Sequence, residues 1–247
     1  MTPPSDNQPL SIRDQSKGTS FEMFNRIAKT YDPVNRMLSF GLDIRWRKRV
    51  GLLLPQKVNG IDLLDLATGT ADQVLFLCAQ HPQKIENAVG MDLSEGMLSI
   101  GREKVKKRNL QDKIVLKTGD ACNLPLEDNS FDAITISFGI RNVPDVPKAL
   151  KEMHRVLRPG GKALILEFAL PKNSIVRFGH LFYLRHVLPT VGGLVSGDKA
   201  AYRYLNTSIE AFPYGEAFAD LMRDAGFTQS NVHNLTMGIA NLYEGIK

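Results

Sequence analysis

The sequence predicts an α/β fold built on a mostly parallel, Rossmann-like sheet. Strand-like and helix-like segments alternate through the middle of the chain, a tight turn of small residues follows the first strand, and carboxylates end two later strands. Strands joined by crossover helices form parallel sheets, which bind their ligands at the carboxyl ends of the strands. We expect a single domain over residues 21–247, preceded by a disordered tail over residues 1–20.

Two helices are expected at the start of the domain. Apolar residues recur at helical spacing from Phe21 to Val50. Because the residue before a proline avoids the helical region, we expect a break at Asp32-Pro33. The joint between the two helices would carry Tyr31, and residues 21–50 would form a helical lid.

Five apolar runs predict parallel strands, and two segments near the C-terminus predict antiparallel edge strands that bring the sheet to seven. The parallel strands are expected at residues 62–67, 88–92, 113–118, 131–137 and 162–168, and the edge strands at 232–236 and 238–243. Helices are expected near residues 72–79, 94–108, 146–157 and 215–224. In the third of these helices, Asp145 is placed to cap the first turn and Pro147 fits within it.

A helical insertion over residues 171–205 is expected to cover the substrate site. Its segment from Pro171 to Lys199 interrupts the alternation and mixes phenylalanines such as Phe178 with arginines such as Arg177. This composition suits an amphipathic element that faces an apolar ligand or a membrane interface. Ordinary packing of helices against the domain would explain the same composition.

Composition and charge are those of an ordinary globular protein, with 43% hydrophobic residues and a net charge of +5. Such mild basicity permits an anionic lipid or nucleic acid partner, but a solvated surface explains it more simply. No secretory signal and no uncharged apolar run of about 18 residues is found, so we expect a cytoplasmic protein. Peripheral contact with the inner face of the membrane stays open. Cys78 and Cys122 form neither a metal-ligand cluster nor a disulfide framework, and we expect no metal site.

The turn after the first strand predicts the class of cofactor. A loop that binds a pyrophosphate usually has the spacing G-x-G-x-x-G, whereas this turn has the single Gly69 and is flanked by Asp65 and Asp72. Carboxylates repel a pyrophosphate and attract a cation. We therefore expect S-adenosylmethionine, with its sulfonium and ammonium groups, in preference to a nicotinamide cofactor.

Each expected cofactor contact lies at the end of a strand. Gly69 lets the backbone approach the ligand closely, Thr70 offers a hydroxyl and an amide, and Asp92 is placed to accept the ribose hydroxyls. The remaining expected contacts are Asp65 at the turn, Asp120 and Ala121 at the adenine, and Ser137 at the methionine end. Taken singly, Asp92 also suits a helix cap, and Asp120 also suits a turn.

The loop after the fourth strand predicts the kind of methyl acceptor. It reads Ser-Phe-Gly-Ile-Arg-Asn over residues 137–142, without the Asn-Pro-Pro-Tyr-like run that is common among amino-methylating enzymes of nucleic acid bases. A cation and an amide at Arg141 and Asn142 would stabilise a phenolate-like oxygen, which activates the adjacent ring carbon. This pattern favours carbon methylation of a hydroxylated ring.

Two segments resemble signatures of the ubiquinone/menaquinone biosynthesis C-methyltransferases. They are Tyr31–Ser39, continuing to Arg45-Trp46, and Arg155–Gly161, continuing to Glu167. Residues 65–72, 137–143 and 202–213 are similar to the same family, from which the chain departs by Asp43 in place of the usual His and Ala71 in place of a common Gly.

The resemblance implies a class I S-adenosylmethionine-dependent methyltransferase fold and transfer of the methyl group to a ring carbon of a polyprenylated quinol. The acceptor would be demethylmenaquinol or the corresponding benzoquinol. Our hypothesis is that Arg141 and Asn142 stabilise the ring oxygen as it loses its proton, while Tyr31 orients the ring or relays the proton.

Several alternatives stay open at this point. Arg141 would otherwise cap a helix, and Tyr31 would pack within the N-terminal helices. A methyltransferase for soluble phenols or sterols would share the cofactor half, and a scaffold subunit of a quinone-synthesis assembly would keep the fold without turnover. An RNA-modifying enzyme would suit the basic pI but lacks a concentrated basic patch, so we expect no nucleic acid partner. The choice of quinol and the formation of a homodimer are not decided by the sequence.

Overall fold

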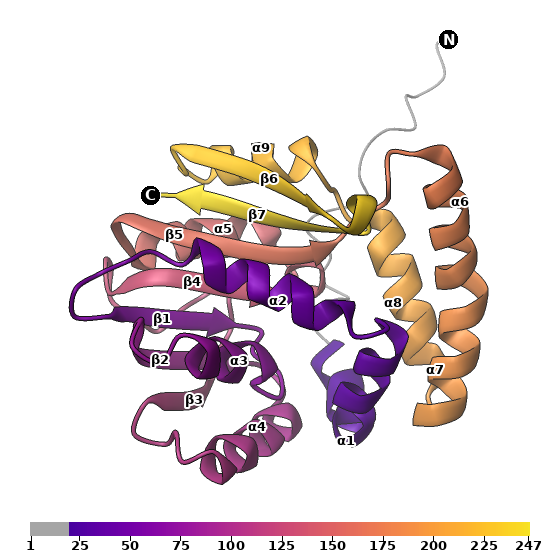
Figure 1. Ribbon diagram of the computed structural model, residues 1–247, viewed down its shortest axis with the longest axis horizontal. Coiled ribbons are helices and arrows are strands. Elements are labelled where there is room, and N and C mark those ends of the chain that lie inside the picture. Colours follow the sequence, from indigo (N-terminus) through magenta and orange to yellow (C-terminus); the bar gives the residue numbers. More distant parts are fainter. Residues whose placement is uncertain (1–19) are drawn as a thin grey trace.

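The structure is a computed structural model that describes residues 20–247, so all but the last residue of the expected N-terminal tail lies outside the described residues. Within that range, one seven-stranded sheet has the strand order β3-β2-β1-β4-β5-β7-β6 (Figure 1). Its strands are β1 Ile61–Leu66, β2 Ile85–Asp92, β3 Ile114–Thr118, β4 Phe131–Ser137, β5 Leu157–Phe168, β6 Gln229–Leu235 and β7 Ala240–Ile246. The expected α/β fold with a mostly parallel sheet is confirmed.

Strands β1 to β5 pair in parallel, and β7 pairs antiparallel with both β5 and β6. The prediction of two edge strands is therefore correct for β6 and wrong for β7, because β7 lies inside the sheet between β5 and β6. Burial explains the difference: β7 is buried from Ala240 to Gly245, whereas β6 alternates with exposed positions. A continuously buried strand suits an interior position.

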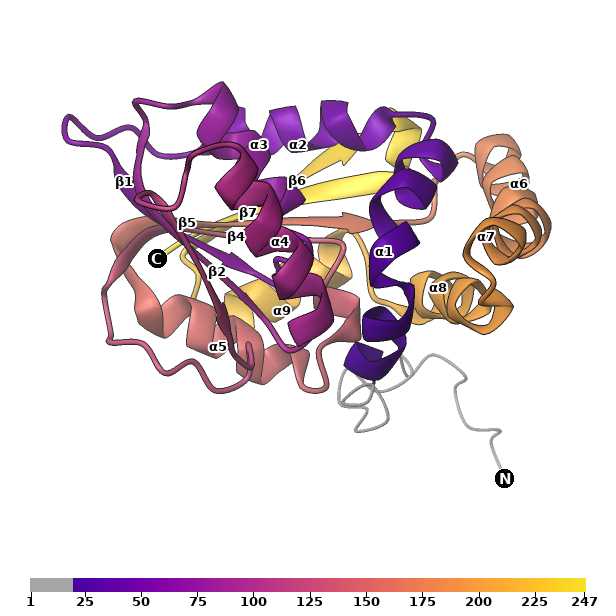
Figure 2. The same ribbon diagram turned by 90° about the horizontal axis from the view of Figure 1, so that it is seen from below.

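Helices surround the sheet, both on its two faces and beyond the carboxyl ends of its strands (Figure 1, Figure 2). They are α1 Ser20–Leu38, α2 Leu42–Leu53, α3 Asp72–Gln80, α4 Glu95–Lys107, α5 Val146–Val156, α6 Ser174–Phe182, α7 Leu188–Ser196, α8 Lys199–Ala211 and α9 Glu216–Asp224. Figure 2 shows α2 and α3 on one face of the sheet and α5 and α9 on the other. At α5 the expected cap is present, since the Asp145 side chain accepts a hydrogen bond from the Lys148 amide.

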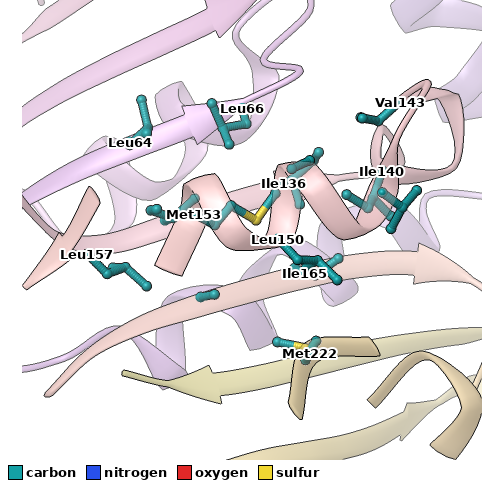
Figure 3. Packing of buried hydrophobic residues seen from close by; sticks show 14 of the residues in the cluster. Leu64, Leu66, Ile136, Ile140, Val143, Leu150, Met153, Leu157, Ile165 and Met222 are labelled. Carbon is teal, nitrogen blue, oxygen red and sulfur yellow. The ribbon is translucent and has the colours of Figure 1, made fainter. Parts of the chain in front are cut away.

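The hydrophobic core forms on both faces because neighbouring strand residues point in opposite directions. Leu63 packs with the residues of α2, α3 and α4, and Leu64 packs with those of α5 and α9. Figure 3 shows Leu150 and Met153 of α5 among the buried side chains of the second group, with Met222 of α9 beyond β5. These two layers hold the carboxyl ends of the strands in fixed positions.

The break expected at Asp32-Pro33 is wrong. Helix α1 continues through Pro33 to Leu38, and the chain turns at Phe40 and Gly41, which have φ angles of 50° and 73°. Proline removes a single amide donor from the helix. Tertiary contacts on both sides of it outweigh that loss: Asp32 bonds to the loop after β1, and Val34 is fully buried.

The expected insertion is helical and longer than predicted. Helix α6 runs through a short π-helical segment, Tyr183–Val187, into α7, and α8 extends to Ala211. Together with α1, these helices form a third hydrophobic cluster beyond the carboxyl ends of the strands (Figure 1). Among the described residues, no helix is both long enough and apolar enough to cross a membrane.

Candidate functional site

Two adjoining hollows lie at the carboxyl ends of the strands. We call the first the large cavity: it measures about 410 Å³ and is lined mainly by apolar and aromatic side chains of α1, α2, α6, α7 and α8. The second, which we call the narrow groove, measures about 90 Å³ and includes the ends of β2 and β3. Six residues line both: Phe24, Tyr31, Ala67, Gly69, Ser137 and Phe138. The two hollows therefore share a wall.

Asp92 and Gly69, two of the expected cofactor contacts, both line the narrow groove and bond to each other there. The Gly69 amide donates to Asp92 Oδ2 over 2.8 Å, and the Ser94 amide donates to Oδ1 over 2.8 Å. Burial raises the pKa of Asp92, and these amides partly oppose the shift. Each carboxylate oxygen has a second lone pair, so the group can still accept two hydroxyls. Gly69 has a φ of 55°, and a side chain there would meet nothing within 4 Å, which leaves the backbone open to a ligand.

The other residues expected at the adenine and methionine ends line the hollows as well. Asp120 and Ala121 line the narrow groove, where Asp120 Oδ1 accepts the Cys122 amide over 2.8 Å. Ser137, at the end of β4, lines both hollows and donates to Gln73 Oε1 over 3.1 Å. Asp120 and Ala121 thus lie in the narrow groove, and Ser137 lies in the wall that it shares with the large cavity.

Asp65 lines the large cavity, and its carboxyl group is bonded within the protein. Its side chain is 1% exposed, and its two oxygens accept the hydroxyls of Thr68 over 2.6 Å and Thr135 over 2.5 Å. Burial raises the pKa of Asp65 to about 6. The carboxyl group therefore ties the loop after β1 to the neighbouring strand β4.

Thr70 uses its hydroxyl away from the narrow groove. Its Oγ1 donates to Asp32 Oδ1 over 2.6 Å and accepts from Lys104 Nζ over 3.0 Å. Lys104 Nζ also contacts Asp32 over 2.5 Å and Asp72 over 2.6 Å. This cluster joins α1 to the loop after β1 and to α4, and Thr70 lines the large cavity.

Arg141 is buried in the wall of the large cavity. Its Nη1 lies 2.6 Å from Glu167 Oε1 and donates to the Phe138 carbonyl over 2.6 Å, while Nε donates to Ser208 over 3.3 Å. Both side chains of the ion pair are less than 5% exposed, at 4% and 1%. A charge at this depth requires such a partner. Nη2 is left without a hydrogen bond to any described residue.

Tyr31 and Asn142 occupy different positions relative to Arg141. Tyr31 lines both hollows, and burial raises the pKa of its phenol, against the opposing charges of Arg141 and Arg47. Asn142 lines only the narrow groove, where its Oδ1 accepts the Tyr204 hydroxyl over 3.1 Å. The structure brings Tyr31 and Arg141 to the large cavity and leaves Asn142 outside that set.

Sequence reasoning missed the partners that fix these groups. Glu167 ends β5, and the rule that carboxylates at strand ends mark a site would have found it. Arg47 and Gln73 line the large cavity, but they belong to α2 and α3, and no local pattern connects them. Asp43, which departs from the resembled family, accepts the Ser39 hydroxyl over 2.8 Å and pairs with Arg36 over 2.6 Å.

Comparison with known proteins adds the family. A model of the ubiE/COQ5 methyltransferase family matches residues 12–247. The chain belongs to this family. Among the similar proteins of the ubiE/COQ5 family, a demethylmenaquinone methyltransferase of Bacteroides fragilis is 43% identical over 92% of this chain and 91% of its own length. One of Thermus thermophilus with the same name is 45% identical over 90% and 99%. A ubiquinone/menaquinone biosynthesis C-methyltransferase of Geotalea daltonii is 43% identical over 92% and 95%.

Solved structures share the fold of this ubiE/COQ5 family member. An S-adenosylmethionine-dependent methyltransferase of Thermotoga maritima superposes with a TM-score of 0.63 at 22% identity, covering 92% of this chain and 99% of its own. A second, from Aquifex aeolicus, has a TM-score of 0.62 at 20% identity, covering 89% and 96%. The resemblance to the quinone-biosynthesis C-methyltransferases, the class I fold and the S-adenosylmethionine dependence expected from the sequence are confirmed.

The described residues fit the methyl donor of this family. The open space beside Gly69 admits a ligand, and Asp92 has lone pairs left for two hydroxyls. The two hollows together offer polar ends for a nucleoside and an apolar space beyond them.

Proposed function

We propose that this ubiE/COQ5 family member transfers a methyl group from S-adenosylmethionine to a ring carbon of a polyprenylated quinol. Demethylmenaquinol and the corresponding benzoquinol are the two acceptors that the names of its relatives support. The observation that carries the proposal is the shared wall: the narrow groove adjoins, at Tyr31 and Ser137, a large cavity with a mostly apolar lining. A hydroxylated ring with a lipid tail matches this arrangement, in which a polar surface lies next to an apolar one.

In this proposal the narrow groove holds the nucleoside. Asp92 accepts the ribose hydroxyls, Asp120 and the backbone of Ala121 face the adenine, and Gly69 lets the loop approach the ligand. The donor supplies an electrophilic methyl group when it is bound. The protein contributes mainly alignment of the two reactants, which provides about 7–11 kcal/mol in well-oriented reactions.

Acceptor activation is assigned to Arg141 and Tyr31. The free Nη2 of Arg141 would donate to the ring oxygen as the oxygen loses its proton, and the Glu167 ion pair would hold the guanidinium in place. The raised pKa of Tyr31 keeps its phenol protonated near neutral pH, so it would orient the ring by a hydrogen bond or relay the proton. Asn142 would act on the nucleoside side, since it lines only the narrow groove.

The proposed activity is tested with labelled S-adenosylmethionine and short-chain naphthoquinol and benzoquinol, each supplied reduced and oxidised. We expect label in at least one reduced acceptor and none in the oxidised forms, because only a quinol hydroxyl can lose a proton to activate the ring carbon. Methylation of neither quinol would contradict the proposed acceptor class.

The role of Arg141 is tested with a paired variant. Arg141→Ala alone would leave Glu167 buried without its cation, which costs roughly 3–5 kcal/mol. The double variant Arg141→Met with Glu167→Gln removes both charges and preserves volume. We expect turnover to fall about 100- to 1000-fold, with binding of S-adenosylhomocysteine within about threefold of the parent by calorimetry. Near-normal turnover would show that Arg141 only supports the fold.

We further propose that the outer face of α6 and α7 docks on a lipid surface. Ile175, Phe178 and Phe182 are 81%, 76% and 55% exposed and recur at helical spacing, while inner residues of the same helices line the large cavity. Exposed Lys172 and Arg177 beside this face suit anionic headgroups. This position would let a lipid-tailed acceptor pass directly from the membrane into the cavity beneath. A second copy of the chain could cover the same face in a homodimer, and the test must distinguish that copy from a lipid surface.

A further inference from the structure

Besides His180, two side chains in the wall of the large cavity carry a buried nitrogen without a hydrogen-bond partner among the described residues. They are Arg47, through Nε, and Gln73, through Nε2. Gln73 is only 3% exposed. A buried donor left unpaired is unfavourable, and such groups are rare in folded proteins. Within the site, Arg47 otherwise acts on the pKa of Tyr31, and Gln73 accepts a hydrogen bond from Ser137.

The orientation of the Gln73 amide follows from its neighbours. Its Oε1 accepts Arg47 Nη1 over 2.9 Å and the Ser137 hydroxyl over 3.1 Å. Because a guanidinium can only donate, Oε1 must be the atom that faces Arg47, and Nε2 is left over as the unpaired group. Gln73 also lies in the first turn of α3, where the helix dipole favours an anion.

Both unpaired groups are donors, so the missing partner is an acceptor. One of them belongs to a guanidinium, whose charge favours an anionic oxygen. The nearest acid, Asp43, has its Oδ2 3.8 Å from Arg47 Nε, beyond hydrogen-bond distance, and it is already bonded to Ser39 and paired with Arg36. A carboxylate with two oxygens would satisfy both donors at once.

The position of the pair identifies the carboxylate. Gln73 is bonded to Ser137, which lines both hollows, so Arg47 and Gln73 lie in the large cavity beside the wall that it shares with the narrow groove. If the nucleoside lies in the groove, its amino-acid arm extends towards this shared wall. We propose that Arg47 and Gln73 bind the α-carboxylate of the methyl donor. The inference rests on the placement of the nucleoside under the proposed function.

The test compares two ligands that differ only in the amino-acid arm. S-adenosylhomocysteine carries the α-carboxylate, and 5′-methylthioadenosine lacks the whole arm. In Gln73→Glu, one side-chain oxygen still accepts from Arg47 and Ser137. The second oxygen replaces the donor Nε2 and would repel a carboxylate. By calorimetry, we expect this variant and Arg47→Met to weaken S-adenosylhomocysteine about 10- to 100-fold and to leave methylthioadenosine within about twofold.

Two further variants serve as controls. Gln73→Met removes the donor without adding charge, and we expect it to weaken S-adenosylhomocysteine less than Gln73→Glu does. Arg49→Met removes the same charge from an exposed position of α2 and should change neither affinity. Retained binding of methylthioadenosine shows that each variant is folded.

Three results would overturn the inference. Equal weakening of both ligands would mean that the pair only supports the fold. Unchanged affinity for S-adenosylhomocysteine with a raised KM for the quinol would assign the two donors to an acceptor oxygen instead. If the parent protein bound both ligands and Asp92→Ala changed the affinity for neither, the placement of the nucleoside itself would be wrong.

Discussion

Asp65 illustrates how a single buried carboxyl group can shape the site through its hydrogen bonds within the protein. Its oxygens hold Thr68 and Thr135, which fixes the loop after β1 against β4. The loop then presents Gly69 to Asp92 on the other side. An acidic residue at this position was expected to attract a cation; within the protein its hydrogen bonds to two threonines give it a supporting role.

The stability of the protein should depend on pH through Asp65. Burial raises its pKa from 3.8 to about 6, so between these values the native state holds a proton that the unfolded state has lost. The contribution of Asp65 to the free energy of unfolding must therefore fall as pH rises from 4 to 6 and stay low above 6. At about 1.4 kcal/mol per pKa unit, the loss is at most about 3 kcal/mol.

Asp65→Asn removes this titration and keeps one acceptor oxygen. We expect the free energy of unfolding of the parent, minus that of Asp65→Asn, to decrease between pH 4 and pH 7. Denaturation with urea at a series of pH values measures both quantities. A difference that does not change over this range would mean that Asp65 titrates normally in the folded protein.

Residue positions at strand ends were predictable from the sequence, and their partners were not. Asp92, Asp120 and Ser137 all line the hollows, because the ends of parallel strands meet at one edge of a sheet. The hydroxyl of Thr70 bonds to Asp32, 38 positions away, and no local pattern reports such a contact. For the same reason the sequence pointed to Arg141 but missed its buried partner Glu167.

At the scale of elements, α1 is the least predictable part of the fold. A proline in mid-sequence usually predicts a helix boundary, yet α1 continues because packing and the contacts of Asp32 stabilise it on both sides of Pro33. Strands and helices with clear periodicity, such as β4 and α5, begin and end close to the expected residues. Local propensity predicts an element well where tertiary contacts agree with it, and fails where they do not.

Thr70→Val tests whether Thr70 anchors α1. Valine keeps the shape of threonine, removes the hydroxyl that bonds to Asp32, and leaves the amide intact. We expect faster hydrogen exchange in α1, a loss of about 1 kcal/mol in stability, and an affinity for S-adenosylhomocysteine within about threefold of the parent.

Thr228→Val is a matched control, because the exposed Thr228 bonds only to the Ile246 carbonyl and its amide stays paired. It should leave exchange in α1 unchanged. A large loss of cofactor affinity in Thr70→Val with normal protection of α1 would assign the hydroxyl to the cofactor instead.

At the scale of the whole molecule, the sheet and its crossover helices were predictable, whereas the order of the last two strands was not. The alternation of segments sets the topology of β1 to β5. The C-terminal hairpin can add to the sheet through either of its strands, and the burial of β7 on both faces decides the order. That burial depends on α9, which precedes the hairpin, and on α2, which lies far away in sequence.

The outer face of α6 and α7 gives a prediction for the whole protein. Phe178→Glu with Phe182→Glu should reduce co-sedimentation with vesicles of phosphatidylcholine and phosphatidylglycerol about tenfold or more. Each of the two exposed aromatic side chains would contribute about 1.5–3 kcal/mol when it inserts into the lipid. Leu52→Glu with Val58→Glu places the same charges at other exposed apolar positions and should bind as the parent does.

Two outcomes would contradict docking on lipid. Binding of the phenylalanine variant at the level of the parent would remove this face from membrane contact. If instead the parent is a dimer by light scattering and the variant a monomer, with vesicle binding unchanged, a second copy of the chain covers the face.

The shared wall of the two hollows also bears on inhibitor design. Because Tyr31, Ser137 and four further residues line both spaces, one compound could occupy them together. A bisubstrate inhibitor would join an adenosine to an alkyl chain through a linker as short as the one-carbon group that is transferred. Its adenosine would be buried in the narrow groove and its alkyl chain in the large cavity. Its selectivity over other methyltransferases would come from the alkyl end, where α6 to α8 distinguish this protein from enzymes that share only the nucleoside half.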